Sequence, residues 1–219
     1  MNGSMGRILS RFPIFGNLWS RVGARVQAKR EAEKLREWEA KGRPAPPPHI
    51  LKQRVLREHS QKYGLRTLVE TGTYCGDMVE AMRGAFDRIY SIELSEELWR
   101  KAKTRFDGQR HIEILHGDSG KVLKDLMKRI DGPSLFWLDG HYSAGVTAKG
   151  DKDTPIYEEF EHILGAPDRR HVVIVDDARL FGTDAAYPSL DELRAFITSR
   201  RTNVEIVVKD DSIRVLPHG

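Results

Sequence analysis

The stretch Thr67-Leu-Val-Glu-Thr-Gly-Thr-Tyr-Cys-Gly-Asp77 decides the fold that this sequence predicts. A short apolar run ends in the carboxylate of Glu70, a tight loop with Gly72 and Gly76 follows, and a helical pattern begins at Met78. Strand, glycine turn and helix in this order are typical of the first unit of a nucleotide-binding α/β sheet. The spacing differs from the dinucleotide fingerprint G-x-G-x-x-G, whose backbone N–H groups bind a pyrophosphate. An acid at the strand end favours a ligand with cationic character instead, although an ordinary strand–turn–helix with a chance acid gives the same pattern.

Strands and helices alternate beyond this point, which predicts a parallel sheet with right-handed crossovers. The expected strands are Thr67–Glu70, Ile89–Glu93, Ile112–His116, Ser134–Asp139 and His171–Asp176, and the expected helices are Met78–Arg83, Glu96–Phe106, Lys121–Ile130, Pro155–Leu164 and Ser189–Ser199. Two last strands, Val204–Lys209 and Ser212–Leu216, are joined by Asp210-Asp211 as a hairpin. The predicted fold is a Rossmann-like, doubly wound, mostly parallel seven-stranded sheet with an antiparallel edge hairpin and an N-terminal helical extension.

The first 48 residues are predicted to be a basic helical extension with a proline-rich linker, and residues 49–219 to be the domain. Residues 1–30 contain six basic residues and no acid, so the remaining chain has 30 basic and 32 acidic residues. Helices are expected at Val22–Lys41 and Ile50–Tyr63, separated by the prolines that follow Gly42. Such an extension can contact a membrane surface, cover an active site or pack in a homodimer, and packing is the favoured role.

The single cysteine, Cys75, excludes an internal disulfide and fits a reducing compartment. No apolar run is long enough to span a bilayer, and the first residues do not resemble a signal peptide. A cytoplasmic protein is therefore expected, with peripheral membrane contact through the basic extension as a further option.

Acidic residues end each of the first five expected strands, an arrangement that chance explains poorly. Ligands of such sheets bind at the carboxyl ends of the strands. Glu93 is placed to accept hydrogen bonds from ribose hydroxyls, whereas Asp118 suits an adenine amino group or the N-cap of the next helix. The complete set is Glu70, Glu93, Asp118, Asp139 and the pair Asp176-Asp177.

The segment Thr67–Asp177 resembles the class I S-adenosylmethionine-dependent methyltransferases. The resemblance rests on Glu-Thr-Gly-Thr-Tyr-Cys-Gly76, on Tyr-Ser-Ile-Glu93 and on Gly-Asp118-Ser. Within that class, Leu-Asp-Gly-His-Tyr142 and Ile-Val-Asp-Asp177 resemble the metal-dependent, macrocin-type sugar O-methyltransferases. One position departs from that family, because His141 stands where an aspartate usually follows Asp-Gly.

The resemblance implies S-adenosylmethionine and a magnesium ion as cofactors and a saccharide hydroxyl as methyl acceptor. The implied cofactor-binding residues are Glu70, Gly72, Thr73, Tyr74, Gly76, Asp77, Glu93, Asp118, Ser119 and Asp139. The implied magnesium ligands are Asp139, Asp176 and Asp177. Carboxylates at neighbouring strand ends repel one another unless a cation or protons join them, and oxygen ligands suit Mg²⁺. Alternatively, Asp177 only caps a turn and Asp139 only touches the cofactor.

His141 and Asp139 are the candidate catalytic residues, since an imidazole titrates near working pH and can receive the acceptor proton. His141 could instead orient Asp139 or pack in the wall of the site. The following segment, Ser143–Thr154, is expected to be a lid, and Lys149 and Lys152 could meet an anionic acceptor.

Competing functions are a nucleic-acid methyltransferase, a methyltransferase for another small molecule, and a non-catalytic cofactor-binding scaffold. The basic extension prompts the nucleic-acid reading, but the element after the fourth strand lacks the prolines of an Asn/Asp-Pro-Pro-Tyr motif. Nucleic acid is therefore the less favoured partner.

Overall fold

The computed structural model describes residues 14–140, 154–167 and 170–218, with side chains from residue 26 onward. The chain divides into two units, Met1–Pro44 and Ala45–Gly219. The predicted boundary at residue 48 stays a prediction.

The first unit contains one long helix, α1 (Ile14–Ala40). It begins earlier than the expected Val22, because the apolar and arginine residues that follow Pro13 are compatible with a helix. In the last turn of this helix, Trp38 Nε1 donates a hydrogen bond at 2.7 Å to the carbonyl of Pro44, which lies beyond the end of the helix. Among the described helices, none combines the length and the apolar character that crossing a bilayer requires.

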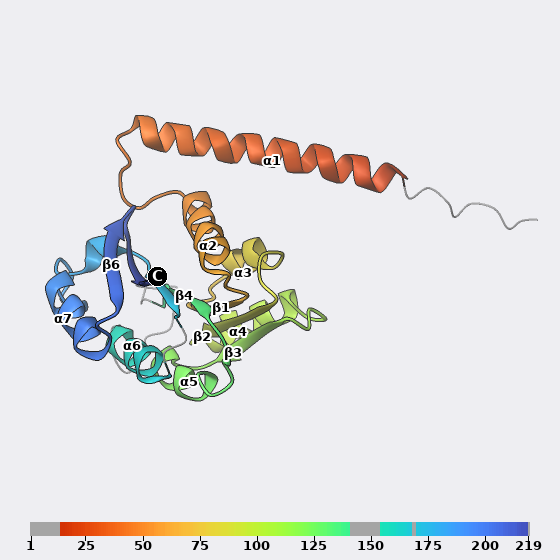
Figure 1. Ribbon diagram of the computed structural model, residues 1–219. Coiled ribbons are helices and arrows are strands. Elements are labelled where there is room, and N and C mark those ends of the chain that lie inside the picture. Colours follow the sequence, from red (N-terminus) through yellow and green to blue (C-terminus); the bar gives the residue numbers. More distant parts are fainter. Residues whose placement is uncertain (1–13, 141–153, 168–169, 219) are drawn as a thin grey trace, which may run out of the picture. The chain divides into compact units, whose positions relative to one another are not determined.

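The second unit is built on a seven-stranded sheet (Figure 1). Its strands are β1 (Thr67–Thr71), β2 (Arg88–Glu93), β3 (Ile112–His116), β4 (Ser134–Leu138), β5 (Val172–Val175), β6 (Val204–Lys209) and β7 (Ser212–Pro217). The order is β3-β2-β1-β4-β5-β7-β6, and β7 is antiparallel to both β5 and β6. The predicted fold is confirmed. The chain reverses its direction of travel across the sheet between β1 and β4, the switch point where such sheets bind ligands.

Helices cover both faces of this sheet (Figure 1). They are α2 (His49–Tyr63), α3 (Asp77–Met82), α4 (Glu96–Arg105), α5 (Ser119–Leu126), α6 (Ile156–Gly165) and α7 (Leu190–Arg200), and a short 3₁₀ helix spans Ala178–Leu180. Their apolar residues form two clusters, one from α2, α3 and α4 and the other from α5, α6 and α7.

The central strands supply alternate residues to these two clusters. In β4, Leu135 and Trp137 join the α2–α4 cluster, whereas Phe136 and Leu138 join the other. Successive side chains of a strand point to opposite faces, so a continuously apolar strand can be buried on both sides. The side chains within the strands are therefore used for packing, and only the residues just beyond the strand ends are available to form a site.

The loop after β1 packs against the end of β4 without space for a side chain. Gly72 has φ +85°, and a Cβ atom there would lie 2.4 Å from the backbone oxygen of Asp139. On the other side, the Gly72 N–H donates to the carbonyl of Ile92 at 2.9 Å. Gly72 thus holds the loop between β2 and β4, which brings the candidate residues of β1, β2 and β4 together.

We expect Gly72→Ala to destabilise the protein clearly more than Gly64→Ala. Gly64 also has a positive φ, of +65°, but a Cβ there would meet nothing within 4 Å. Gly64→Ala therefore costs only the left-handed backbone strain, about 1–2 kcal/mol, whereas Gly72→Ala adds an overpacking cost of about 1–3 kcal/mol. Urea unfolding of both variants measures the difference, and equal losses would contradict the packing described for Gly72.

Candidate functional site

A buried carboxyl group lies at the end of β1. Glu70 is only 2% exposed, and its carboxylate accepts a short hydrogen bond from the hydroxyl of Ser91 on β2. That hydroxyl is also 2.6 Å from the hydroxyl of Thr73 in the glycine loop. Burial raises the pKa of Glu70 to about 8, the Ser91 hydrogen bond lowers it, and the charge of Glu93 adds to the rise. Glu70 therefore retains its proton around neutral pH in the free protein.

The carboxylate at the end of β2 is held by the backbone. Glu93 Oε2 accepts a hydrogen bond from the Tyr74 N–H at 2.7 Å, and its Oε1 accepts one from the Ser95 N–H at 2.8 Å. Tyr74 adopts a left-handed conformation with φ +48°, which directs its N–H toward Glu93. Each carboxylate oxygen has a second lone-pair direction, so Glu93 can still accept hydrogen bonds from a ligand.

The predicted adenine-binding residues have structural partners of their own. Asp118 caps α5, because its Oδ1 accepts from the Gly120 N–H at 2.9 Å. The Ser119 hydroxyl donates at 2.6 Å to Glu159, a buried residue of α6. Burial raises the pKa of Glu159 to about 7, while the hydrogen bond from Ser119 opposes the rise. A role of Asp118 and Ser119 toward adenine stays a prediction.

The end of the glycine loop is fixed by α4. A Cβ on Gly76 would lie 2.7 Å from the ring of Phe106, and φ is +78°. Asp77 begins α3 with an exposed carboxylate, paired with Arg105 at 2.7 Å. Of the predicted cofactor-binding set, Asp77 is thus turned toward α4 and solvent.

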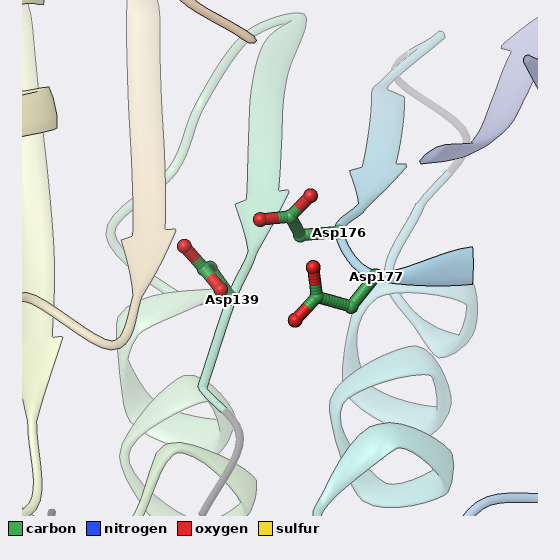
Figure 2. A group of neighbouring side chains, drawn as sticks. All are labelled: Asp139, Asp176 and Asp177. Atoms are coloured by element: carbon green, nitrogen blue, oxygen red, sulfur yellow. The ribbon is translucent and has the colours of Figure 1, made fainter. Parts of the chain in front are cut away.

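Three aspartates converge where β4 and β5 end (Figure 2). One carboxylate oxygen of each of Asp139, Asp176 and Asp177 lies within 4.8 Å of the others. The Asp139 N–H donates to Thr71 and the Asp176 N–H donates to Leu138, which fixes both backbones relative to the sheet. The structure thus brings together the three residues that the sequence predicted as metal ligands; we refer to them as the acid triad.

Burial disfavours the ionised form of two carboxyl groups of the acid triad. It raises the pKa of Asp139 well above its usual range, and the charge of Asp176 adds to the effect. Burial also raises the pKa of Asp176, against the opposing charge of Lys52. Because the fully ionised triad is unfavourable, it attracts either protons or cations.

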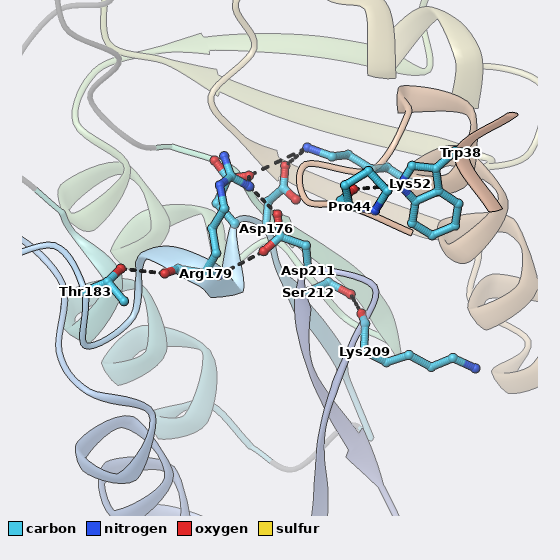
Figure 3. A network of polar contacts seen from close by, with 10 residues as sticks. Trp38, Pro44, Lys52, Asp176, Arg179, Thr183, Lys209, Asp211 and Ser212 are labelled. Atoms are coloured by element: carbon cyan, nitrogen blue, oxygen red, sulfur yellow. Dashed lines mark hydrogen bonds and ion pairs between the residues drawn. The ribbon is translucent and has the colours of Figure 1, made fainter. Parts of the chain in front are cut away.

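Two basic residues from other elements reach the acid triad (Figure 3). Lys52 of α2 makes a close ion pair with Asp176 Oδ2, and its Nζ lies 3.9 Å from Asp177 Oδ1. Burial acts to lower the pKa of Lys52, but the charge of Asp176 and its neighbours raises it overall. Arg179 pairs with Asp177 at 2.8 Å and with Asp211 at the turn of the β6–β7 hairpin.

The sequence pattern did not indicate a role for Lys52, Arg179, Glu159 or Tyr187. Lys52 carried a usable signal, since it lies three and four residues before the buried Val55 and Leu56 and so shares their face of α2. Burial and the charge of Asp177 raise the pKa of the Tyr187 phenol, and its ring packs edge-on against that of Phe181.

Several predicted residues cannot be placed. His141, Lys149, Lys152 and most of the predicted lid, Ser143–Thr154, lie outside the described residues. The choice between His141 and Asp139 as base therefore stays open.

The raised pKa of Glu70 predicts that the stability of the protein depends on pH. The Glu70 pKa of about 8 in the folded chain lies above its ordinary value of 4.5. Between these pH values the folded state binds the extra proton, so the free energy of unfolding falls as pH rises. We expect Glu70→Gln to flatten this fall by up to about 1.4 kcal/mol per pH unit.

Urea unfolding from pH 5 to pH 8 measures the slope. Glu97→Gln is the control, because Glu97 is an exposed partner of Lys101 and is ionised in both states over this range. A Glu70→Gln protein with the slope of the wild type would refute the assignment of a buried, protonated Glu70.

Comparisons with known proteins complete the picture of the fold. Neither a family model nor a curated protein matches the sequence. Solved structures do match. An O-methyltransferase from Bacillus cereus, in complex with SAH, is 19% identical with a TM-score of 0.56, over 85% of this chain and 90% of that one.

Two further structures extend this likeness. The O-methyltransferase TomG from Streptomyces achromogenes, in complex with SAM, gives the same identity of 19% and TM-score of 0.56, over 86% of this chain and 89% of that one. The N-methyltransferase NodS from Bradyrhizobium japonicum is 13% identical with a TM-score of 0.52, over 78% and 97%. This chain therefore has the Rossmann-like fold of the class I methyltransferases.

Proposed function

We propose that this protein is an S-adenosylmethionine-dependent, Mg²⁺-dependent O-methyltransferase that acts on a hydroxyl of a saccharide. The observation that carries the proposal is the acid triad at the ends of β4 and β5, beside the carboxyl groups that end β1 and β2. The O-methyltransferases of Bacillus cereus and Streptomyces achromogenes, which share the fold and contain SAH or SAM, support the choice of cofactor and reaction.

The chemistry of the carboxyl groups fits S-adenosylmethionine. This molecule has an ammonium, a sulfonium and ribose hydroxyls but no phosphate. Glu93, fixed by two backbone N–H groups, would accept from the ribose hydroxyls. Glu70 lies one strand away, and a cationic ligand group nearby would favour its ionised form. Gly72 and Thr73 would keep the loop close to the ligand.

The acid triad fits a hard divalent cation. Its ligand atoms are carboxylate oxygens, which suit Mg²⁺. The acid triad and Asp211 together have four carboxylates, whereas Lys52 and Arg179 supply two positive charges, which leaves an excess of negative charge. Burial, together with the neighbouring carboxylates, raises the pKa values of Asp139 and Asp176. A divalent ion held by Asp139, Asp176 and Asp177 would remove that excess.

The protein's contribution to catalysis would be alignment and proton transfer. The bound cofactor supplies a methyl carbon already activated by its sulfonium. A metal ion held by the acid triad would supply a Lewis acid that lowers the pKa of an acceptor hydroxyl. The residues at the strand ends would hold the acceptor against the methyl group, which requires rigid side chains. His141, two residues beyond Asp139, would take the hydroxyl proton, with Asp139 as the alternative.

Methylation assays over a panel of saccharides, each with Mg²⁺ and with excess EDTA, test the proposal. We expect methyl transfer to a saccharide hydroxyl only in the presence of Mg²⁺. Methylation of non-saccharide hydroxyls alone would refute the acceptor class. Tight, salt-dependent capture of RNA or DNA in a filter-binding assay would favour a nucleic-acid acceptor instead.

We expect Glu93→Ala to weaken S-adenosylmethionine binding by about 1.5–3 kcal/mol, the range for hydrogen bonds to a charged group. This corresponds to a roughly 10- to 150-fold higher Kd in calorimetry. Glu97→Ala removes an exposed carboxylate four residues away, paired only with a surface lysine, and should leave the Kd unchanged. A folded Glu93→Ala protein with normal affinity would refute the role of Glu93.

Removal of the metal should separate catalysis from cofactor binding. We expect EDTA and Asp176→Asn each to abolish methyl transfer but to leave S-adenosylmethionine affinity within a fewfold, because no phosphate of the cofactor needs the ion. Asp125→Asn, at an exposed carboxylate paired with Lys128, serves as the control and should retain activity. Full activity in excess EDTA would refute the metal requirement.

A further inference from the structure

We propose that Lys52 is a resident counter-ion of the acid triad, which a divalent cation must displace in order to bind. This inference rests on the metal site of the proposed function and concerns its regulation. It makes the metal affinity of the protein a property of α2 as well as of the three aspartates.

Lys52 lies close to the proposed metal ligands. Its ammonium makes an ion pair with Asp176 Oδ2 (Figure 3). It also lies 3.9 Å from Asp177 Oδ1, so it is close to two of the three proposed metal ligands. The side chain is only 16% exposed. A cation shared by all three carboxylates would come close to this ammonium, and like charges at such distances repel strongly in a buried site.

The ammonium of Lys52 is held mainly by the acid triad itself. Among the described residues, the polar partners of Lys52 are carboxylates of the triad, and the ring of Trp137 lies 6.0 Å from Nζ. Lysine is a point charge on a flexible four-carbon stem, so Nζ can move away without unfolding α2.

Arg179, the other cation, is held differently. Its backbone N–H donates to Asp211 Oδ1 at 2.9 Å, and its guanidinium pairs with the same carboxylate. Asp211 anchors Arg179 whether or not a metal binds, so Lys52 is the cation that can exchange.

The ion pair of Lys52 affects both the stability of the metal-free protein and its affinity for a metal ion. Buried carboxylates without a cation repel one another, so Lys52 stabilises the metal-free protein with its ligands already gathered. A metal ion that binds the triad gains the interaction with its carboxylates, but the ion pair of Lys52 is lost. The binding free energy of the metal is therefore less favourable by the free energy of that ion pair. Removal of the ammonium should therefore destabilise the metal-free protein and tighten metal binding.

The test compares Lys52→Gln with Lys62→Gln in the full chain. Lys62 lies on the same helix but faces the ring of Tyr63, with Nζ 4.9 Å from its centroid. Mn²⁺ binding, followed by electron paramagnetic resonance, replaces Mg²⁺ with a detectable ion of similar ligand preference. We expect Lys52→Gln to bind Mn²⁺ at least about tenfold more tightly than the wild type, which is a gain of about 1.4 kcal/mol. Without metal it should melt at a lower temperature, and Lys62→Gln should match the wild type in both measurements.

A second measurement uses the wild type and does not depend on the folding of a variant. Labelling with an amine-reactive reagent, followed by mass spectrometry of peptides, reports the accessibility of each lysine. Saturating Mn²⁺ should raise the labelling rate of Lys52 severalfold and leave that of Lys62 unchanged.

Unchanged or weaker Mn²⁺ binding by Lys52→Gln, or unchanged labelling of Lys52 at saturating Mn²⁺, would overturn the exchange. The absence of Mn²⁺ binding by both the wild type and Lys52→Gln would also overturn it. Calorimetry with S-adenosylmethionine then distinguishes the causes, because retained cofactor binding would confine the failure to the metal site.

Discussion

The carboxyl groups that lie together at the carboxyl ends of the parallel strands are the constraint on which the rest of this structure depends. Glu70, Glu93 and the acid triad lie at the ends of adjacent strands, and most of these carboxyl groups are buried. Each is neutralised in a different way. Glu70 keeps a proton, Glu93 accepts two backbone N–H groups, and the triad is paired with Lys52 and Arg179. A proton, backbone N–H groups and basic side chains thus each stabilise part of this group of acids.

The same constraint links elements that are distant in the sequence. Lys52 comes from the helix before the sheet, Arg179 from the turn after β5, and Asp211 from the terminal hairpin. The carboxylates at the strand ends are thus paired with charges from both the first helix and the last hairpin of the second unit. Mutations far from the glycine loop can therefore alter the candidate site.

The sequence was sufficient to predict the architecture because its signals are local. The apolar runs gave all seven strands within one or two residues, and Asp210-Asp211 correctly indicated the hairpin. The acid triad was also predictable, since strand ends in a parallel sheet meet at one edge. Lys52 and Glu159 were missed because a charged residue in a helix looks solvated until the opposing surface is known. The role of His141 could not be predicted for a similar reason. It depends on which group the imidazole contacts, and the sequence pattern does not indicate that group.

The position of β7 has a consequence for biosynthesis. This strand, Ser212–Pro217, follows β6 in the sequence, yet it lies inside the sheet between β5 and β6. Until it emerges from the ribosome, β5 has an unpaired edge and Asp211 cannot anchor Arg179. Pairing over such sequence distances is slow, and unpaired strand edges favour aggregation. A nascent chain that stalls before β7 would thus combine an exposed β5 edge with an Arg179 side chain that Asp211 does not yet anchor.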